Sequence, residues 1–250
     1  MATVYNPFSL ENKTVLVTGA SSGIGRATAT ECSKMGAKVV ITGRNVERLN
    51  ETFLLLTGGG HLQFVADLVN DNDIKTLTEL LPNLQGIALC AGIDKLIPVK
   101  FNKREDYEDI MQTNFYSNLC LIQSLQKKKK IDKGASIILI SSIASFTASV
   151  GHALYAASKG ALDSFAKVLA LEFASQQIRV NTIRPGVVDT NMLAMGIIAD
   201  EEYKKEEMRY PLKRFGRPKE IAYAIIYLLS DASAWTTGAN LIIDGGFTLL

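Results

Sequence analysis

The sequence predicts an α/β fold, a doubly wound, parallel, seven-stranded sheet with helices on both faces. Short apolar runs rich in β-branched residues recur along the chain, which is typical of strands buried on both faces of a parallel sheet. Helical stretches fill the gaps between these runs, and such alternation indicates a doubly wound architecture. The predicted strands are 14–19, 38–43, 62–67, 86–92, 136–142, 178–186 and 239–246. The predicted helices include 23–36, 103–127, 152–175 and 218–230.

The composition is that of a globular protein with a substantial core. Of the 250 residues, 47% are hydrophobic and 21% are charged. Lysine and arginine number 27 and aspartate and glutamate 25, and the resulting net charge of +2 argues against a nucleic-acid partner. No linker rich in Pro, Gly or Ser divides the chain, so we expect one domain over residues 1–250.

The three cysteines, Cys32, Cys90 and Cys120, lie far apart in the sequence. Their odd number and the lack of metal-ligand spacing indicate reduced, packed thiols, a cytoplasmic protein and no metal site. We see no signal peptide, and no apolar run approaches the ~20 residues of a membrane helix, so no membrane partner is expected. The only charge run, QKKKK at 126–130, is expected at a helix C-terminus, where cations are favoured.

A glycine-rich turn, TGASSGIG at 18–25, follows the first predicted strand and opens the first helix. Gly19, Gly23 and Gly25 there would permit a tight turn and close approach of the backbone to a pyrophosphate at the helix N-terminus. The spacing differs from the common G-x-G-x-x-G fingerprint. We interpret the turn as a dinucleotide-binding loop; a plain tight βα turn is the alternative.

The end of the second strand should meet the adenosine ribose of such a cofactor. The sequence there is ITGRN, so Gly43 and Arg44 occupy the position where a carboxylate would select NAD. Arg44 can donate to a 2′-phosphate, which favours NADP(H) over NAD(H); a solvated loop residue is the alternative. Asp67, at the end of the third strand, could accept from the adenine amino group or serve as a helix N-cap.

Tyr155 and Lys159 lie four positions apart in ALYAASKGAL, which puts them on one helix face. Ser142 precedes Tyr155 by thirteen residues. With the glycine loop and seven strands, these residues resemble the short-chain dehydrogenase/reductase family. The matching motifs, in order, are TGASSGIG (18–25), ADL (66–68), AG (91–92), Asn114 in MQTNFYS, SS (141–142), YAASK (155–159), RPGVVDT (184–190) and GANLIIDGG (238–246).

The resemblance covers the chain from about residue 10 to 248 and implies a Rossmann-type fold. It implies that residues 1–135 hold the cofactor and that 136–250 carry the catalytic and substrate residues. Tyr155 would be the acid/base, with a pKa lowered from near 10 by Lys159 and by the oxidised nicotinamide. Lys159 would also hold the nicotinamide ribose, Ser142 the substrate carbonyl, and Asn114 a water that leads protons to Lys159.

The resemblance and the motifs give a set of expected binding residues. Candidate cofactor contacts, besides Tyr155 and Lys159, are Gly19, Ser21, Ser22, Gly23, Ile24, Gly25, Arg44, Asn45, Asp67, Leu68, Ala91, Gly92, Pro185, Gly186, Val188 and Thr190. Candidate substrate-pocket residues are Ile143, Ala144, Phe146, Val150, His152, Met192 and Met195. Apolar residues followed by DEEYKKEE suggest an amphipathic lid over 190–218; a fixed peripheral helix pair is the alternative.

Two positions depart from the family pattern. Cys90 stands where an asparagine is usual, and we expect local repacking with Cys90 as a buried small hydrophobe. Many relatives of this appearance are 3-oxoacyl-acyl-carrier-protein reductases with an arginine after the YxxxK motif, where this chain has Leu171. The lysines at 127–130 could partly substitute. The expected activity is therefore carbonyl/alcohol interconversion, with 3-oxoacyl thioester reduction one possibility and sugars, polyols, steroid-like compounds or small ketones the others.

Other classes of function are weighed against this one. A catalytically silent dinucleotide-binding scaffold or sensor would not need Asn114, Ser142, Tyr155 and Lys159 together. A kinase would need a G-K-[ST] phosphate loop, which the sequence lacks. The family resemblance implies a homotetramer or homodimer, with helices 103–127 and 152–175 at one interface and the C-terminal strand at another; a monomer with well-buried helices is the alternative.

Overall fold

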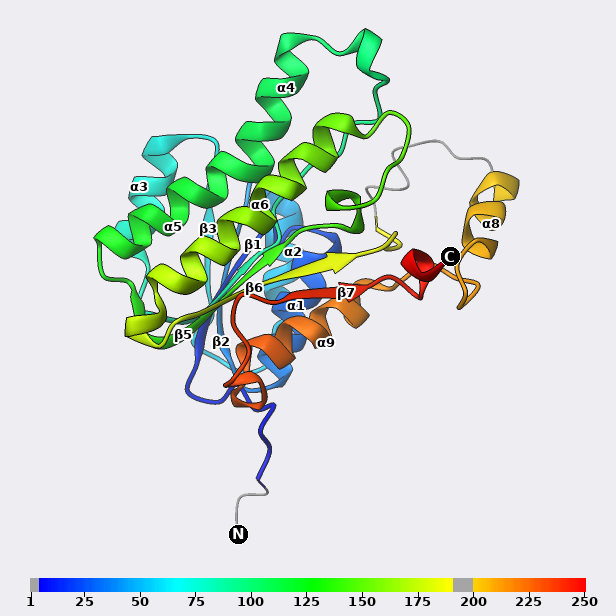
Figure 1. Cartoon of the computed structure of the whole chain (residues 1–250). Coiled ribbons are helices and arrows are strands. Elements are labelled where there is room, and N and C mark those ends of the chain that lie inside the picture. The colour runs from blue at the N-terminus through cyan, green and yellow to red at the C-terminus, as the bar shows by residue number, and fades with distance from the viewer. Residues whose placement is uncertain (1–4, 191–199) are drawn as a thin grey trace.

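The computed structural model describes residues 5–190 and 200–250 and contains the predicted seven-stranded sheet (Figure 1). All strands are parallel, in the order β3-β2-β1-β4-β5-β6-β7. The strands are β1 Thr14–Thr18, β2 Lys38–Gly43, β3 Leu62–Val65, β4 Leu84–Leu89, β5 Ile131–Ile140, β6 Arg179–Pro185 and β7 Asn240–Ile243. The fold class and all seven strands are confirmed. The boundaries differ most at β5, which begins five residues before the predicted position.

The helices confirm the four predicted examples and add others between the early strands. They are α1 Gly23–Lys34, α2 Val46–Leu54, α3 Asp71–Leu80, α4 Arg104–Met111, α5 Ser117–Lys127, α6 Ala153–Glu172, α8 Asp200–Met208 and α9 Pro218–Leu229. The predicted helix over 103–127 is interrupted by a π-helical turn at Gln112–Tyr116, between α4 and α5. Such a turn frequently marks a functional site, and this one carries Asn114.

Each face of the sheet is covered by its own hydrophobic core. Residues such as Leu77, Leu121 and Leu162 place α3, α5 and α6 over one face. Leu49 and Ile225 are among those that place α1, α2 and α9 over the other. Because helices cover both sides of the inner strands, β1 and β4 are almost entirely buried, as their apolar pattern predicted.

The strand order brings the loops that matter for function together at the carboxyl ends of the strands. The chain runs outward from β1 to β3, then returns to place β4 beside β1 on the opposite side. In such sheets a ligand binds outside the carboxyl ends of the strands, where the order reverses. The segments that follow β1, β4, β5 and β6 therefore meet there.

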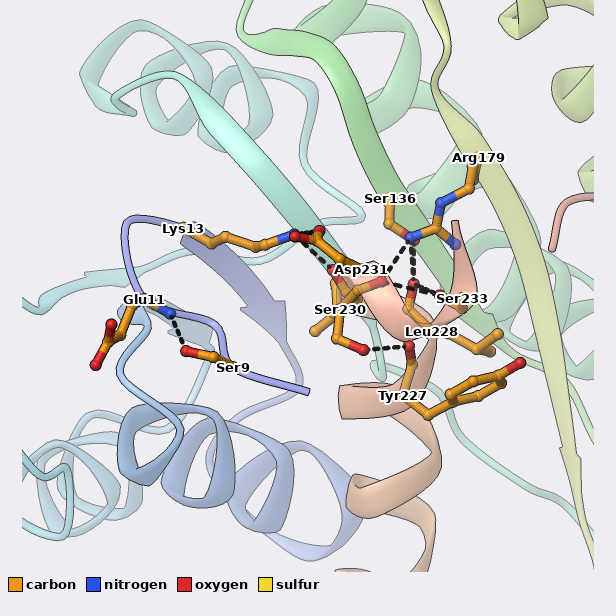
Figure 2. Close-up of polar contacts among 11 residues, drawn as sticks. Ser9, Glu11, Lys13, Ser136, Arg179, Tyr227, Leu228, Ser230, Asp231 and Ser233 are labelled. Carbon is orange, nitrogen blue, oxygen red and sulfur yellow. Dashed lines mark hydrogen bonds and ion pairs between the residues drawn. The ribbon is translucent and has the colours of Figure 1, made fainter. Parts of the chain in front are cut away.

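At the amino ends of the strands, polar side chains from β5, from β6 and from the residue before β1 bind the C-terminal end of α9 (Figure 2). The Leu228 carbonyl accepts from Arg179 Nη2 at 2.8 Å, from Ser136 Oγ at 2.6 Å and from Ser233 Oγ at 3.0 Å. Lys13 Nζ contacts the Leu229 carbonyl at 3.4 Å. The last turn of α9 has no basic residue of its own, so Arg179 and Lys13 supply the cations that a helix C-terminus favours.

Two predictions outside the site are settled by the fold. The QKKKK run lies at the end of α5, which ends at Lys127, as predicted. The possibility that Asp67 is a helix N-cap is wrong, because Asn70 caps α3 by accepting from the Asn72 amide at 2.9 Å. No helix among residues 5–190 and 200–250 is long and apolar enough to cross a membrane.

Candidate active site

The glycine-rich turn has no room for side chains at its key positions. Gly19 has φ +63, and a Cβ there would lie 2.8 Å from the Ala91 backbone. A Cβ on Gly25 would lie 2.3 Å from the Gly19 carbonyl oxygen, so α1 begins directly against the turn. Ser22 is the extended N-cap of α1 and makes no side-chain capping bond. The first amides of α1 and the Ser22 hydroxyl are therefore available to an anion.

The end of β2 presents Arg44 at the surface. Its guanidinium lies 3.9 Å from the Asp67 carboxylate, and both side chains are largely exposed. Asn45 caps α2 by accepting from the Arg48 amide at 2.8 Å, so its side chain is already used. Leu68 is buried in the core, which leaves only its backbone open to a cofactor. Arg44 and Asp67 thus remain the side chains that could meet the adenosine end.

The end of β4 is tied to β1 by Thr18, which the sequence reading did not single out. Its hydroxyl accepts from the Cys90 amide at 3.1 Å and from the Ala91 amide at 3.2 Å. Cys90 is partly buried and packs against the core cluster, as predicted for a small hydrophobe. Burial raises the pKa of its thiol to about 12, so Cys90 stays a neutral thiol.

Asn114 is fully buried and bridges two distant segments. Its Oδ1 accepts from the Ile93 amide at 2.8 Å, while its Nδ2 donates to the Ile93 carbonyl at 2.9 Å and to Ser158 Oγ at 3.0 Å. The side chain of Asn114 therefore bonds to segments 21 and 44 positions away in the sequence. Asn114 joins the loop after β4 to α6, next to Lys159.

Lys159 is buried, and its Nζ donates to the Ile140 carbonyl at 2.8 Å. A Cβ added at Gly92 would lie 3.3 Å from Asn114 Oδ1 and 3.4 Å from Lys159 Nζ. Gly92 is therefore packed closely against these two polar atoms, and a side chain there would crowd both. Burial lowers the pKa of the ammonium to about 8, against the opposing effect of Asp94, Cys90 and Asp163.

Tyr155 lies in the first turn of α6, and Lys159 Nζ is 5.5 Å from its ring centroid. Burial, followed by the charge of Asp94, raises the pKa of the phenol to about 12, whereas a hydrogen bond with Ser142 lowers it. The expectation that Lys159 depresses this pKa is wrong for the cofactor-free protein, because loss of hydration outweighs the other effects. Ser142 follows β5 and also accepts from the Ala144 amide at 3.1 Å.

The loop after β6 closes the other side of the glycine turn. A Cβ on Gly23 would lie 3.2 Å from Thr190, and one on Gly186 would lie 3.0 Å from the Asp244 backbone. Pro185 ends β6, and Val188 forms an isolated bridge with Gly216. The predicted residues of RPGVVDT are thus brought to the glycine turn, at Thr190 most directly.

The predicted pocket wall divides into buried and open residues. Ile143 is buried, and its assignment to the pocket wall stays a prediction. Phe146 is 47% exposed and lies under the Arg184 guanidinium, whose carbon is 4.9 Å from the ring centroid. Val150 is 88% exposed, and Ala144 is half-buried. Met192 and Met195, with most of the apolar part of the expected lid, lie outside the described residues.

Sequence comparison identifies the family. Residues 19–248 match a family model described as "Enoyl-(Acyl carrier protein) reductase", one of the models of short-chain dehydrogenases/reductases. The chain belongs to the short-chain dehydrogenase/reductase family. It is accordingly an NAD(P)-dependent dehydrogenase or reductase.

Similar members of the family differ in what they act on. A mouse 3-oxoacyl-[acyl-carrier-protein] reductase is 35% identical over 242 residues, 95% of this chain and 99% of that protein. A glucose 1-dehydrogenase from Gluconobacter oxydans (strain 621H) is 34% identical over 251 residues, 95% of this chain and 92% of that protein. A candidate NAD(P)-dependent gluconate 5-dehydrogenase from Beutenbergia cavernae, solved with NADP bound at low occupancy, has a TM-score of 0.89 and 30% identity, covering 98% and 100% of the two chains.

The structure adds one residue near Tyr155 that the family motifs did not indicate. Asp94 lies two residues after Gly92, and its Oδ2 is 3.3 Å from His152 Nε2. The His152 ring is 6.2 Å from the Tyr155 ring, centroid to centroid. The signal was available, since Asp94 follows the carboxyl end of an inner strand, where ligands of such sheets bind. Among the described residues, no cluster of three or more His, Cys, Asp or Glu could hold a metal.

Proposed function

We propose that this short-chain dehydrogenase/reductase is an NADP(H)-dependent oxidoreductase that interconverts a carbonyl and a secondary alcohol, with Tyr155 as acid/base. One observation carries the proposal. The phenol of Tyr155, the hydroxyl of Ser142 and the buried ammonium of Lys159 gather at the carboxyl end of β5, beside the glycine turn. A folded scaffold gains little from a lysine buried at this position, because burying its charge is costly.

The residues present fit a dinucleotide. Gly19 and Gly25 let the turn pack directly against the backbone of Ala91 and of Gly19, and the N-terminus of α1 has no side-chain cap. The Ser22 hydroxyl and the first amides of α1 would hold the pyrophosphate. When bound, the dihydronicotinamide supplies the hydride that reduces the carbonyl carbon.

The chain's own residues supply the proton. The Ser142 hydroxyl donates to the substrate carbonyl oxygen and orients it, while Tyr155 gives its phenolic proton to that oxygen as the alcohol forms. With a pKa near 12, the phenol carries its proton at neutral pH and is ready for the reducing direction. Lys159 then returns a proton to the phenolate. A water bound near Asn114 Oδ1 and Lys159 Nζ would supply that proton, and both atoms lie close to Gly92.

Arg44 supports NADP(H) over NAD(H). It stands at the end of β2 with its guanidinium at the surface, and Asp67 at 3.9 Å is its one ion-pair partner among the described residues. A guanidinium can donate two parallel bonds to a 2′-phosphate. The NADP bound to the Beutenbergia cavernae protein is consistent with this preference.

The first experiment follows NADPH oxidation with a panel of carbonyl compounds, using the native protein, Tyr155→Phe and Ser142→Ala. The panel includes acetoacetyl and crotonyl thioesters, sugars and small ketones. Turnover by the native protein and a loss of about 100-fold or more in Tyr155→Phe would support the proposal. NADPH binding without turnover of any compound, and with no difference between native and Tyr155→Phe, would favour the silent scaffold or sensor.

The mouse relative supports reduction of a 3-oxoacyl thioester by this chain, whereas Leu171 argues against it. Leu171 lies on α6 and is 80% exposed, so an acidic carrier protein would meet an apolar side chain where an arginine is expected. The sugar dehydrogenase relative favours the alternative. The crotonyl thioester separates carbonyl reduction from reduction of a carbon–carbon double bond.

We further propose a single domain over residues 1–250 that assembles as a homotetramer. Val168 and Leu171 are exposed on α6, at 53% and 80%, and Ile242 is 42% exposed on the edge strand β7. These apolar side chains lie where the two expected interfaces would form. A monomer in sedimentation at micromolar concentration would contradict the assembly.

A further inference from the structure

Asp94 and His152 come from two loops that the fold holds together. The Ile97 amide donates to the Gly151 carbonyl at 2.9 Å, which joins the loop after β4 to the turn before α6. Lys95 Nζ contacts carboxylates of Asp106 and Asp109 on α4, both at 2.9 Å. These contacts fix the backbone on both sides of the pair without help from Asp94 or His152.

The pair is placed for contact with a molecule bound at Tyr155. His152 Nε2 is 3.3 Å from Asp94 Oδ2, and the two side chains are 26% and 28% exposed. The other ring nitrogen, Nδ1, is 3.2 Å from Ser149 Oγ, so the imidazole is held from both sides. The ring stands edge-on to Tyr155 at 6.2 Å. Asp94 therefore lies beside the acid/base with one carboxylate oxygen engaged.

The second carboxylate oxygen of Asp94, Oδ1, is the atom that points to a ligand. Oδ1 is enclosed and has no hydrogen-bond partner among the described residues. A carboxylate oxygen without a donor is costly when shielded from water, so the arrangement calls for a donor. The charge also works against catalysis, since Asp94 makes Tyr155 a weaker acid. We expect an arrangement that lowers both the stability of the protein and the acidity of Tyr155 where a bound ligand compensates for the loss.

We propose that Asp94, held by His152, binds a hydroxyl group adjacent to the reacting carbon, so that the substrate is a neutral polyhydroxylated compound such as a sugar or polyol. A carboxylate accepts from an alcohol and gives a charge-assisted bond. A 3-oxoacyl thioester has no hydroxyl to donate and would leave Oδ1 unpaired. The inference rests on the proposed function, because it places the reacting carbon at Tyr155.

The test compares two alcohols that differ by one hydroxyl, trans-1,2-cyclohexanediol and cyclohexanol, as substrates for NADP-dependent oxidation. We expect kcat/KM for the diol to exceed that for cyclohexanol by about 10- to 100-fold. Asp94→Asn should reduce this ratio to near one, mainly through KM for the diol, whatever change in Tyr155 acidity the two alcohols share. His152→Gln should reduce the ratio partly. Lys95→Met, which loosens the same loop but keeps both groups of the pair, should lower the Tm and reduce the ratio far less than Asp94→Asn does.

The outcomes separate this inference from the proposed function. Oxidation of both alcohols with a ratio near one in the native protein, or a ratio unaffected by Asp94→Asn, overturns the hydroxyl subsite and leaves the oxidoreductase standing. If neither alcohol reacts, calorimetric titration of the NADP-loaded protein with the diol decides. Binding that is lost in Asp94→Asn supports the subsite although the proposed function fails, and no binding overturns it.

Discussion

The ammonium of Lys159 donates to the Ile140 carbonyl at 2.8 Å, and this bond holds a buried cation at the carboxyl end of β5. Burial lowers the pKa of that ammonium from 10.5 to about 8. Lys159 is therefore charged below about pH 8 and neutral above it. A proton relay through Lys159 needs the charged form, so its pKa should be visible in the rate of reduction.

We predict that kcat/KM for NADPH, which reports ionisations of the free enzyme, falls as pH rises through about 8. Tyr155, with a pKa near 12, stays protonated across that range and does not contribute. Lys159→Arg keeps its charge in the same range, because an arginine does not lose its proton there. The variant should be slower but lack the decline near pH 8. A decline that persists in Lys159→Arg would assign it to another group.

Replacement of Arg44 tests the cofactor preference. Arg44→Ala removes the guanidinium at the end of β2 and should raise KM for NADPH by about 10- to 100-fold, the loss of a charge-assisted phosphate contact. KM for NADH should change little, because NADH has no 2′-phosphate. Lys38→Ala provides the control, since Lys38 lies at the opposite end of the same strand, β2. Equal effects of Arg44→Ala on both cofactors would contradict the assignment.

Gly92 offers a test of the proposed water near Asn114 and Lys159. In Gly92→Ala, the new Cβ would lie 3.3 Å from Asn114 Oδ1 and 3.4 Å from Lys159 Nζ, which displaces a bridging water and crowds both atoms. We expect kcat for carbonyl reduction to fall by about 10- to 100-fold. Gly160→Ala, one residue after Lys159, meets its nearest atom at 3.9 Å and should leave kcat unchanged. Comparable kcat values for the two variants would show that no such water is needed.

The sequence was sufficient for the sheet and for the position of most site residues. Strands buried on both faces leave an apolar signal that needs no tertiary information, and the carboxyl ends of parallel strands necessarily share an edge. Gly19 and Gly25 were expected to permit a tight turn, and the structure packs both against protein backbone; their approach to a pyrophosphate stays a prediction. Ser142, Tyr155 and Lys159 required the family motifs, because their spacing alone is common.

What the sequence could not give depends on contacts between distant segments. The pKa of Tyr155 was expected to fall, but burial is a property of the folded chain and raises it. The main partner of the Asn114 side chain is Ile93, 21 positions away, and no pattern in the sequence joins the two. The role inferred for Asp94 depends on its contact with His152, which lies 58 residues further along the sequence and is brought to it by the fold.

The C-terminal end of α9 gives a prediction about stability, remote from the site (Figure 2). Arg179 Nη2 donates to the carbonyls of Leu228 at 2.8 Å and Ser230 at 3.3 Å, and Nη1 donates to that of Thr236 at 3.3 Å. Arg179→Met keeps most of the aliphatic stem but removes these charge-assisted bonds, which should lower the free energy of unfolding by about 2–3 kcal/mol. In a chain of this size the Tm should fall by about 4–10 °C.

A matched arginine provides the comparison for Arg179→Met. Arg104 is exposed, and among the described residues its ion-pair partner is Glu108, one turn along α4 at 2.7 Å. Arg104→Met should therefore change the free energy of unfolding by less than about 0.5 kcal/mol. Thermal unfolding followed by circular dichroism measures both variants. Because α9 covers the core on one face of the sheet, loosening its C-terminus should lower stability without changing KM for NADPH. Equal Tm values for the two variants would mean that water replaces the guanidinium at these carbonyls without loss.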